Sequence, residues 1–155
     1  MVVGRAEHLL EEGFIVAVNK WASKLDKKDK AYEHHLTEAL WVHQWHNVVD
    51  EAFLKKMLRS PDYHARAAAT RVLCYWRDRV KDPLALLKVQ VGDESPRVRL
   101  EAVRACSFFK TSQAAEVALE VLEKETDPKK PDYYIKYCLD ETMKALDKYT
   151  KQPAN

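Results

Sequence analysis

One short unit recurs along the chain at intervals of 30 to 37 residues, and this repeat constrains the fold more than any other feature. Each copy has one core residue and a second core residue four positions later. Two adjacent core residues follow, the first of them three positions after the second core residue. The copies lie at 35–43, 65–73, 98–106 and 135–143. Spacings of three and four place these positions on one face of an α-helix. Because a unit of this length cannot bury an apolar face alone, the repeat predicts stacked helical units.

The second core position is alanine in three of the four copies, at Ala39, Ala69 and Ala102. A small side chain there lets two helices approach closely, and the residues three and four positions later fill the seam. With only 3 Gly and 6 Pro in 155 residues, the chain has few of the tight turns that an all-β fold needs. We therefore predict an all-α fold, a right-handed α-solenoid of helical hairpins.

Prolines and capping residues divide the chain into about eight predicted helices. Proline fits only the first turn of a helix, so 60–62, 82–83 and 95–96 each mark the end of one helix and the start of another. The charged run 26–30 interrupts the pattern as a solvated loop. We predict a single domain over residues 1–155 with a flanking helix, three hairpins and a terminal helix, at 5–25, 31–59, 62–91, 95–125 and 131–148.

Residues 96–105, PRVRLEAVRA, resemble the first helix of the HEAT repeat, whose pattern is P-x-V-R-x-x-A-x-x-A. The copy at 65–73 is a fair match to the same pattern, and the two outer copies are degenerate. The resemblance covers about residues 31–148. It implies an armadillo-like stack of helical hairpins that serves as a protein-binding scaffold.

A narrower resemblance is carried by residues 32–44, 67–78 and 96–105. These stretches are similar to the HEAT segment of large exported haem-binding dehydrogenase-like proteins of planctomycete-type bacteria, which also contain a propeller and a cytochrome c module. The resemblance implies a structural segment of a periplasmic or exported redox protein. The chain has no C-x-x-C-H haem attachment motif, so no redox role transfers to any residue here.

The charge balance does not favour nucleic acid as a partner. The chain carries 26 basic and 24 acidic residues, a net charge of +2, whereas phosphate binding needs a concentrated basic surface. It has no apolar run of membrane-spanning length, and residues 1–10 lack the apolar core of a signal peptide. We expect a soluble chain without a membrane span, whose compartment the sequence leaves open.

Catalytic motifs are absent from the sequence, and we expect neither an enzyme nor a bound cofactor. No phosphate-binding glycine loop, G-x-S-x-G or H-E-x-x-H string is present. Cys74, Cys106 and Cys138 lie in apolar helical patterns without a C-x-x-C pair. We expect them to be buried free thiols.

The histidines suggest one metal site, although a structural interpretation is favoured. His43, His46 and Asp50 would share one face of an uninterrupted helix, as metal ligands do. However, residues 47–50 have the composition of a hairpin turn, which would move Asp50 away. His43 takes the place of Leu73 in the next copy, so a core histidine hydrogen-bonded across the hairpin is the preferred reading.

Arg66, Arg99 and Lys136 occupy equivalent positions and admit two interpretations. They could form a ladder of ion pairs with acidic residues of the adjoining turns, such as Asp62 or Asp93. Alternatively, they could line the concave side as an anion-binding surface. The ladder is the favoured interpretation.

The aromatic residues of the middle segment also admit two interpretations. Core packing is the favoured explanation for Trp41, Trp45, Tyr75 and Trp76, and Trp45 or His46 is expected to close the first hairpin. If two or more of these side chains are exposed on one face, they mark a hot spot for a protein partner. Trp41 and Trp45 are therefore candidate binding residues.

The repeat, the mixed charge and the lack of catalytic motifs together predict a non-catalytic protein-binding or scaffold segment. Its partner would be another protein or neighbouring domains of a longer chain, since aromatic residues such as Trp21 and Tyr137 leave the end helices apolar. A structural segment of an exported redox protein is the second hypothesis. A nucleic-acid-acting HEAT protein is the least favoured, and the oligomeric state stays open.

Overall fold

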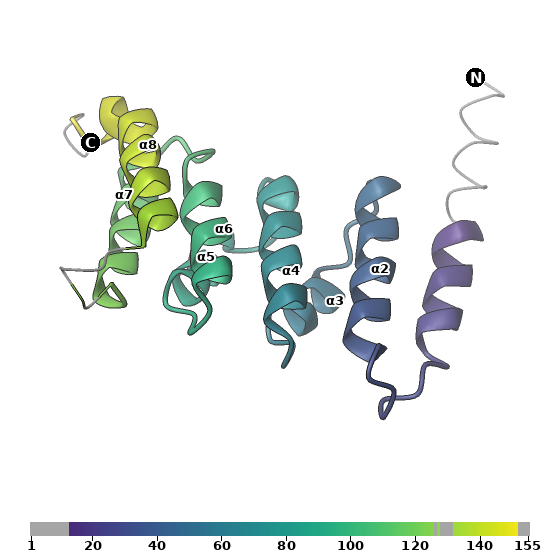
Figure 1. The fold of residues 1–155 in the computed structure, drawn as a ribbon. Helices are drawn as coiled ribbons and strands as arrows, with labels where there is room; N and C mark the ends of the chain where they lie inside the picture. Colours follow the sequence, from purple (N-terminus) through teal and green to yellow (C-terminus); the bar gives the residue numbers. More distant parts are fainter. Residues whose placement is uncertain (1–12, 126, 128–131, 152–155) are drawn as a thin grey trace, which may run out of the picture.

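The computed structural model describes residues 13–125, 127 and 132–151, and within these ranges the chain is helical without β-strands (Figure 1). Residues 13–22 form the first described helix. The helices that follow are α2 (Tyr32–Trp45), α3 (Glu51–Met57), α4 (Tyr63–Trp76), α5 (Pro83–Val91), α6 (Pro96–Cys106), α7 (Ser112–Leu119) and α8 (Tyr133–Thr150). A short 3-10 helix, η1 (Glu120–Glu123), extends α7. The all-α prediction is confirmed.

The helices form two rows of a solenoid. Helices α2, α4, α6 and α8 lie side by side in one row, and each contacts the next (Figure 1). Helices α3, α5 and α7 connect them and pack against their backs. Each of the three hairpins, α2–α3, α4–α5 and α6–α7, therefore buries one side against its neighbour, as the repeat predicted.

Side-chain caps define where most helices begin. Carboxylate or hydroxyl oxygens of Asp50, Asp62, Asp82, Thr111 and Asp132 accept hydrogen bonds from backbone N–H groups of the first turn. Such caps satisfy donors that have no partner within the helix. Pro83 and Pro96 occupy the first helical position of α5 and α6, where their missing N–H costs nothing.

The small residues of the repeat lie where helices cross. Ala39, Ala69 and Ala102 are at most 1% exposed, and all three lie on helices of the same row. The apolar residues that follow in the repeat, such as Val72 and Leu73, are fully buried in the same core. Small buried side chains at these positions are compatible with the close approach of α2, α4 and α6 that the repeat predicts.

Several predicted bounds shift by a few residues. The expected first helix at 5–25 is helical over 13–22, and the rest of its N-terminal part lies outside the described residues. The expected terminal helix at 131–148 spans Tyr133–Thr150. The assignment of residues 1–155 to one domain stays a prediction.

The three cysteines are free thiols in the helical core. Cys74 and Cys106 are buried and Cys138 is half-buried. Burial raises the pKa of the Cys106 thiol to about 12, so it stays protonated. Of the helices described, none has the length and apolar character required to cross a membrane.

Candidate functional site

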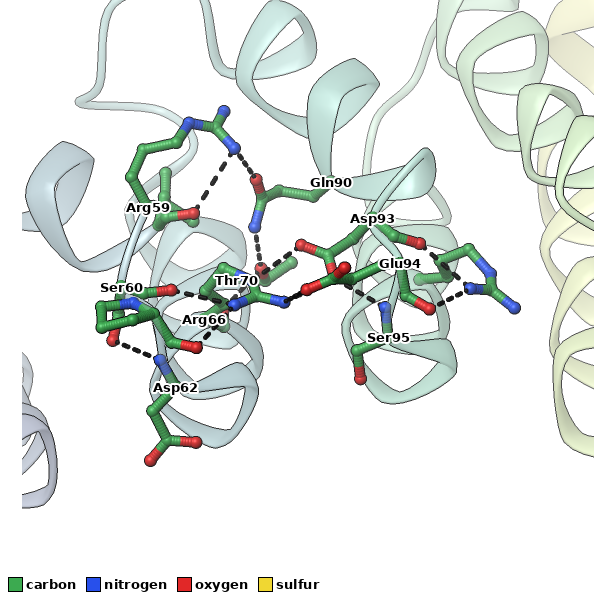
Figure 2. A network of polar contacts seen from close by, with 12 residues as sticks. Arg59, Ser60, Asp62, Arg66, Thr70, Gln90, Asp93, Glu94 and Ser95 are labelled. Atoms are coloured by element: carbon green, nitrogen blue, oxygen red, sulfur yellow. Dashed lines mark hydrogen bonds and ion pairs between the residues drawn. The ribbon is translucent and has the colours of Figure 1, made fainter.

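A polar network joins consecutive hairpins through Arg66 at the start of α4 (Figure 2). Its Nε donates to Asp93 Oδ2 at 2.8 Å, and its Nη2 donates to Asp93 Oδ1 at 3.0 Å. Nη1 donates to the backbone carbonyls of Ser60 and Pro61 at 2.9 and 3.3 Å. The guanidinium therefore holds together the turn before α4 and the turn before α6.

The same contact recurs one hairpin later. Arg99 Nη1 donates to the carbonyls of Asp93 and Glu94, both at 3.0 Å, and its Nη2 donates to Glu125 Oε1 at 2.9 Å. Arg66 and Arg99 are each only 8% exposed. Both are therefore removed from the candidate binding surface, and the ladder interpretation describes them.

The ladder does not extend to both ends of the solenoid. In the first hairpin, where Leu36 replaces the arginine, the hydroxyl of Ser60 donates to the carboxylate of Glu33 instead. At the far end, the Lys136 side chain is exposed and forms no ion pair with the described residues. The two arginine contacts thus belong to the second and third hairpins.

Electrostatics reinforces the contact between Arg66 and Asp93. The hydrogen bond to Asp93 raises the pKa of Arg66 above its usual value. Burial of the Asp93 carboxyl favours its neutral form, but hydrogen bonds from Arg66 and the Ser95 N–H, with the nearby positive charge, lower the pKa of Asp93 overall. Both groups therefore stay charged, and this pair has a structural role.

The proposed metal ligands do not converge. His43 is 1% exposed, and its Nε2 lies 2.9 Å from Asn19 Oδ1 on the first helix. His46 stacks on Phe14, and Asp50 accepts from the Phe53 N–H as the N-cap of α3. No group of three His, Cys, Asp or Glu side chains within the described ranges is arranged to hold a metal ion.

His43 is a core histidine, but its partner differs from the one expected. We expected a hydrogen bond across the α2–α3 hairpin, whereas the bond connects α2 to the preceding helix. Burial lowers the pKa of His43, and the Asp50 charge and the Val48 backbone only partly oppose this effect. The ring is therefore neutral near neutral pH.

The aromatic residues at the ends of α2, α4 and α6 form two series one residue apart. The inner series contains His46, Trp76 and Phe109, of which Trp76 is buried and the other two are half-buried. Trp76 and Phe109 pack in or against the hydrophobic core, whereas His46, the more buried of the two candidates at the end of α2, stacks on Phe14 of the first helix. We call the other series, Trp45, Tyr75 and Phe108, the outer aromatic row.

The outer aromatic row is exposed at equivalent positions of three consecutive hairpins. Trp45 is 86% exposed, Tyr75 56% and Phe108 47%. Trp41, one turn before Trp45, is 47% exposed. Core packing therefore does not explain these residues, which contradicts the favoured sequence interpretation for Trp41, Trp45 and Tyr75.

A hollow of about 450 Å³ lies next to this row. Its floor is formed by the small side chains of Ala67 and Ala68 on α4. Ala68 is the equivalent of Glu38 on α2 and Glu101 on α6, so the smaller side chain opens the space. The remaining lining residues come from all three helices and are Trp41, Gln44, His64, Arg71, Tyr75, Arg97 and Glu101.

Arginines surround the hollow and the outer aromatic row. Arg71 Nη2 pairs with Glu101 Oε1 at 2.5 Å, whereas the side chain of Arg97 forms no hydrogen bond or ion pair with the described residues. The guanidiniums of Arg77 and Arg104 lie 5.4 and 5.5 Å from the ring centroid of Phe108. The exposed aromatic surface is thus bordered by positive charge.

A second hollow, of about 470 Å³, lies between the first helix, α2 and α3. Ala22, Leu25, Leu36 and Phe53 provide its apolar lining. Asp50, its only acidic lining residue, already caps α3. None of the exposed aromatic residues Trp41, Trp45, Tyr75 and Phe108 lines this hollow.

Sequence reasoning singled out Trp41 and Trp45 and considered Tyr75 with them, but it missed Phe108 and did not place Arg97 and Arg104 beside these aromatic residues. The signal was present in the repeat, because Trp45, Tyr75 and Phe108 are separated by the same 30- and 33-residue offsets as the alanines at 39, 69 and 102. Extending the repeat register beyond the core positions would have found the row.

The stacked helical hairpins and the arginine contacts that join them define an α-solenoid. The family model described as HEAT repeats matches residues 51–130, just over half of the chain. The chain belongs to the HEAT-repeat family. Comparison with curated proteins and with solved structures gives no match, so no relative supports the narrower resemblance to dehydrogenase-like proteins.

Proposed function

We propose that this chain is a non-catalytic scaffold segment that binds a protein through the outer face of α2, α4 and α6. The observation that carries the proposal is the exposure of Trp41, Trp45 and Tyr75 on this face. HEAT repeats commonly form protein-interaction scaffolds, which supports the same function. Trp41 and Trp45 were candidate binding residues from the sequence, and Tyr75 joins them.

Exposure of clustered aromatic side chains to solvent is energetically unfavourable. Large aromatic side chains dominate the energetics of protein interfaces, and isolated exposed ones need no explanation. Here Trp41 and Tyr75 line the same hollow, and Trp45 lies one turn from Trp41 on α2. A cluster of this kind around a concave floor is typical of the centre of a binding surface.

Site-specific photocrosslinking would test this function. A photoreactive amino acid replaces Gln44, which lines the hollow, and a control protein carries it in place of Lys88 on α5. In lysate of the source organism, we expect one protein to crosslink from position 44 and to be lost on Trp41→Ala substitution. The same products from both positions, or products insensitive to Trp41→Ala, would contradict the proposal.

A structural segment of an exported redox protein remains a second proposal, and it rests on the sequence resemblance alone. It is compatible with the first, because such a segment would bind the neighbouring domains of its own chain. The nucleic-acid hypothesis has less support, since Glu38, Asp78 and Glu101 lie among the basic residues of α2, α4 and α6 or beside them.

A further inference from the structure

We propose that the partner segment is an extended acidic peptide that carries large apolar side chains at regular intervals. This inference rests on the proposed protein-binding function and specifies the chemistry of the partner. One apolar side chain would enter the hollow over Ala67 and Ala68, and carboxylates would pair with the arginines around it.

The hollow favours an apolar anchor. Ala67 and Ala68 provide an apolar floor, and the rings of Trp41 and Tyr75 provide apolar walls. The volume of about 450 Å³ accommodates a large side chain together with part of the peptide backbone. Burial of one Leu- or Phe-sized side chain there is favourable by about 1.5 to 3 kcal/mol from transfer alone.

The charge around the hollow favours carboxylates on the partner. Glu101, the acidic residue of the hollow's lining, is neutralised by Arg71, whose Nη2 lies 2.5 Å from its Oε1. Arg97, which lines the hollow, is exposed and its side chain has no such counterion within the described residues. Arginine is well suited to bind carboxylates because its planar guanidinium donates two parallel hydrogen bonds.

The row geometry favours an extended segment that crosses the helices. Trp45, Tyr75 and Phe108 occupy the same position on three neighbouring helices. Packed helices are separated by about 10 Å, and an extended chain in the polyproline II conformation advances about 3.1 Å per residue with three residues per turn, so that every third side chain points to the same side. One step along the row therefore corresponds to about three residues of the peptide. Apolar side chains about three positions apart would contact successive rings.

Selection from a displayed library of random linear peptides tests whether the surface prefers acidic peptides with spaced apolar side chains. The library is first depleted on the Trp41→Ala/Tyr75→Ala double variant and then selected on the wild-type chain. We expect the recovered peptides to be enriched in Asp and Glu and to carry Trp, Phe or Leu about three positions apart. Affinities of the recovered peptides are then measured by fluorescence anisotropy.

Charge reversal on the chain supplies the matched control. We expect Arg97→Glu to weaken binding of the selected acidic peptides by at least about tenfold. Lys136→Glu makes the same charge change on α8, away from the hollow, and we expect a change of less than about twofold. Circular dichroism of each variant checks that the helices are intact, and Arg97→Gln provides a milder change at the same position.

The remaining outcomes separate the inference from the proposed function. Neutral or basic peptides whose binding requires Trp41 and Tyr75 would overturn the acidic partner and leave protein binding in place. A library without any peptide that depends on these rings would contradict both. A single-stranded thymidine oligonucleotide that displaces the peptides, and whose own binding is lost in the double variant, would assign the surface to nucleic acid instead.

Discussion

The Arg66 guanidinium donates two parallel hydrogen bonds to the Asp93 carboxylate, at 2.8 and 3.0 Å, and thereby connects consecutive hairpins. The side chains of both residues are about nine-tenths buried. The pair therefore connects the second hairpin to the third at a point that excludes most water.

Removal of one member of this pair should be costly. We expect Arg66→Ala to lower the free energy of unfolding by about 3 kcal/mol or more, because the Asp93 charge stays buried without its partner. Arg66→Lys should recover only part of this loss, since lysine cannot form the two parallel bonds. Urea denaturation followed by circular dichroism measures both. Lys88→Ala, which removes an exposed pair with Glu120, is the control and should leave the unfolding midpoint unchanged.

The same carboxylate predicts a pH dependence of stability. The pKa of Asp93 is lowered in the folded chain, so the unfolded chain binds more protons at acidic pH. The stabilisation from Asp93 is thus fully present above its unfolded pKa of about 3.9 and is lost as the pH falls through its folded value. Asp93→Asn should flatten the acidic limb of a plot of unfolding free energy against pH. An unchanged slope in this variant would contradict the assignment.

His43 predicts a second, milder effect nearer neutrality. Burial lowers its pKa in the folded chain, so below the unfolded value of about 6.5 the unfolded state takes up the proton first. Stability should therefore fall as the pH decreases from about 7 to about 5. Hydrogen exchange should show the loss first in residues 13–22, which contact His43 through Asn19. In His43→Leu, which restores the residue type of the next repeat, this part of the pH dependence should disappear.

The alanines of the repeat predict sensitivity to larger side chains. We expect Ala69→Leu or Ala102→Leu to destabilise the chain by about 1 to 3 kcal/mol, because both positions are fully buried in the core. Ala145→Leu makes the same change at an exposed site on α8 and should have little effect. Thermal unfolding of the three variants measures the difference. Equal midpoints would mean that close helix approach does not depend on these alanines.

The helical core could be predicted from the sequence because its signals are local. Ala69 and Ala102 stand at fixed positions of a repeat, and Asp62 and Thr111 precede helices that they cap. The ladder was only partly predictable. The sequence offered both Asp62 and Asp93 as partners of Arg66, and the choice of Asp93 depends on how one hairpin packs on the next.

The candidate surface was harder to predict for a geometrical reason. Trp45 and His46 are adjacent, and neighbouring helical residues point about 100° apart, so both lie near the edge of the buried face. The local pattern did not decide which of the two turns inward. The bond from His43 to Asn19 was unpredictable for another reason, since Asn19 lies outside the recurring unit.

The two aromatic series predict that the same substitution, Trp to Ala, has a large effect on stability in the inner series and almost none in the outer aromatic row. Trp76→Ala should lower the free energy of unfolding by about 3 to 5 kcal/mol, because this side chain is 1% exposed and its removal leaves a cavity. Trp45→Ala should change it by less than about 0.5 kcal/mol, since the ring is 86% exposed. Chemical denaturation of both variants measures the contrast. A tryptophan that folding does not need is then available for binding, and a large loss of stability in Trp45→Ala would instead assign it to the core.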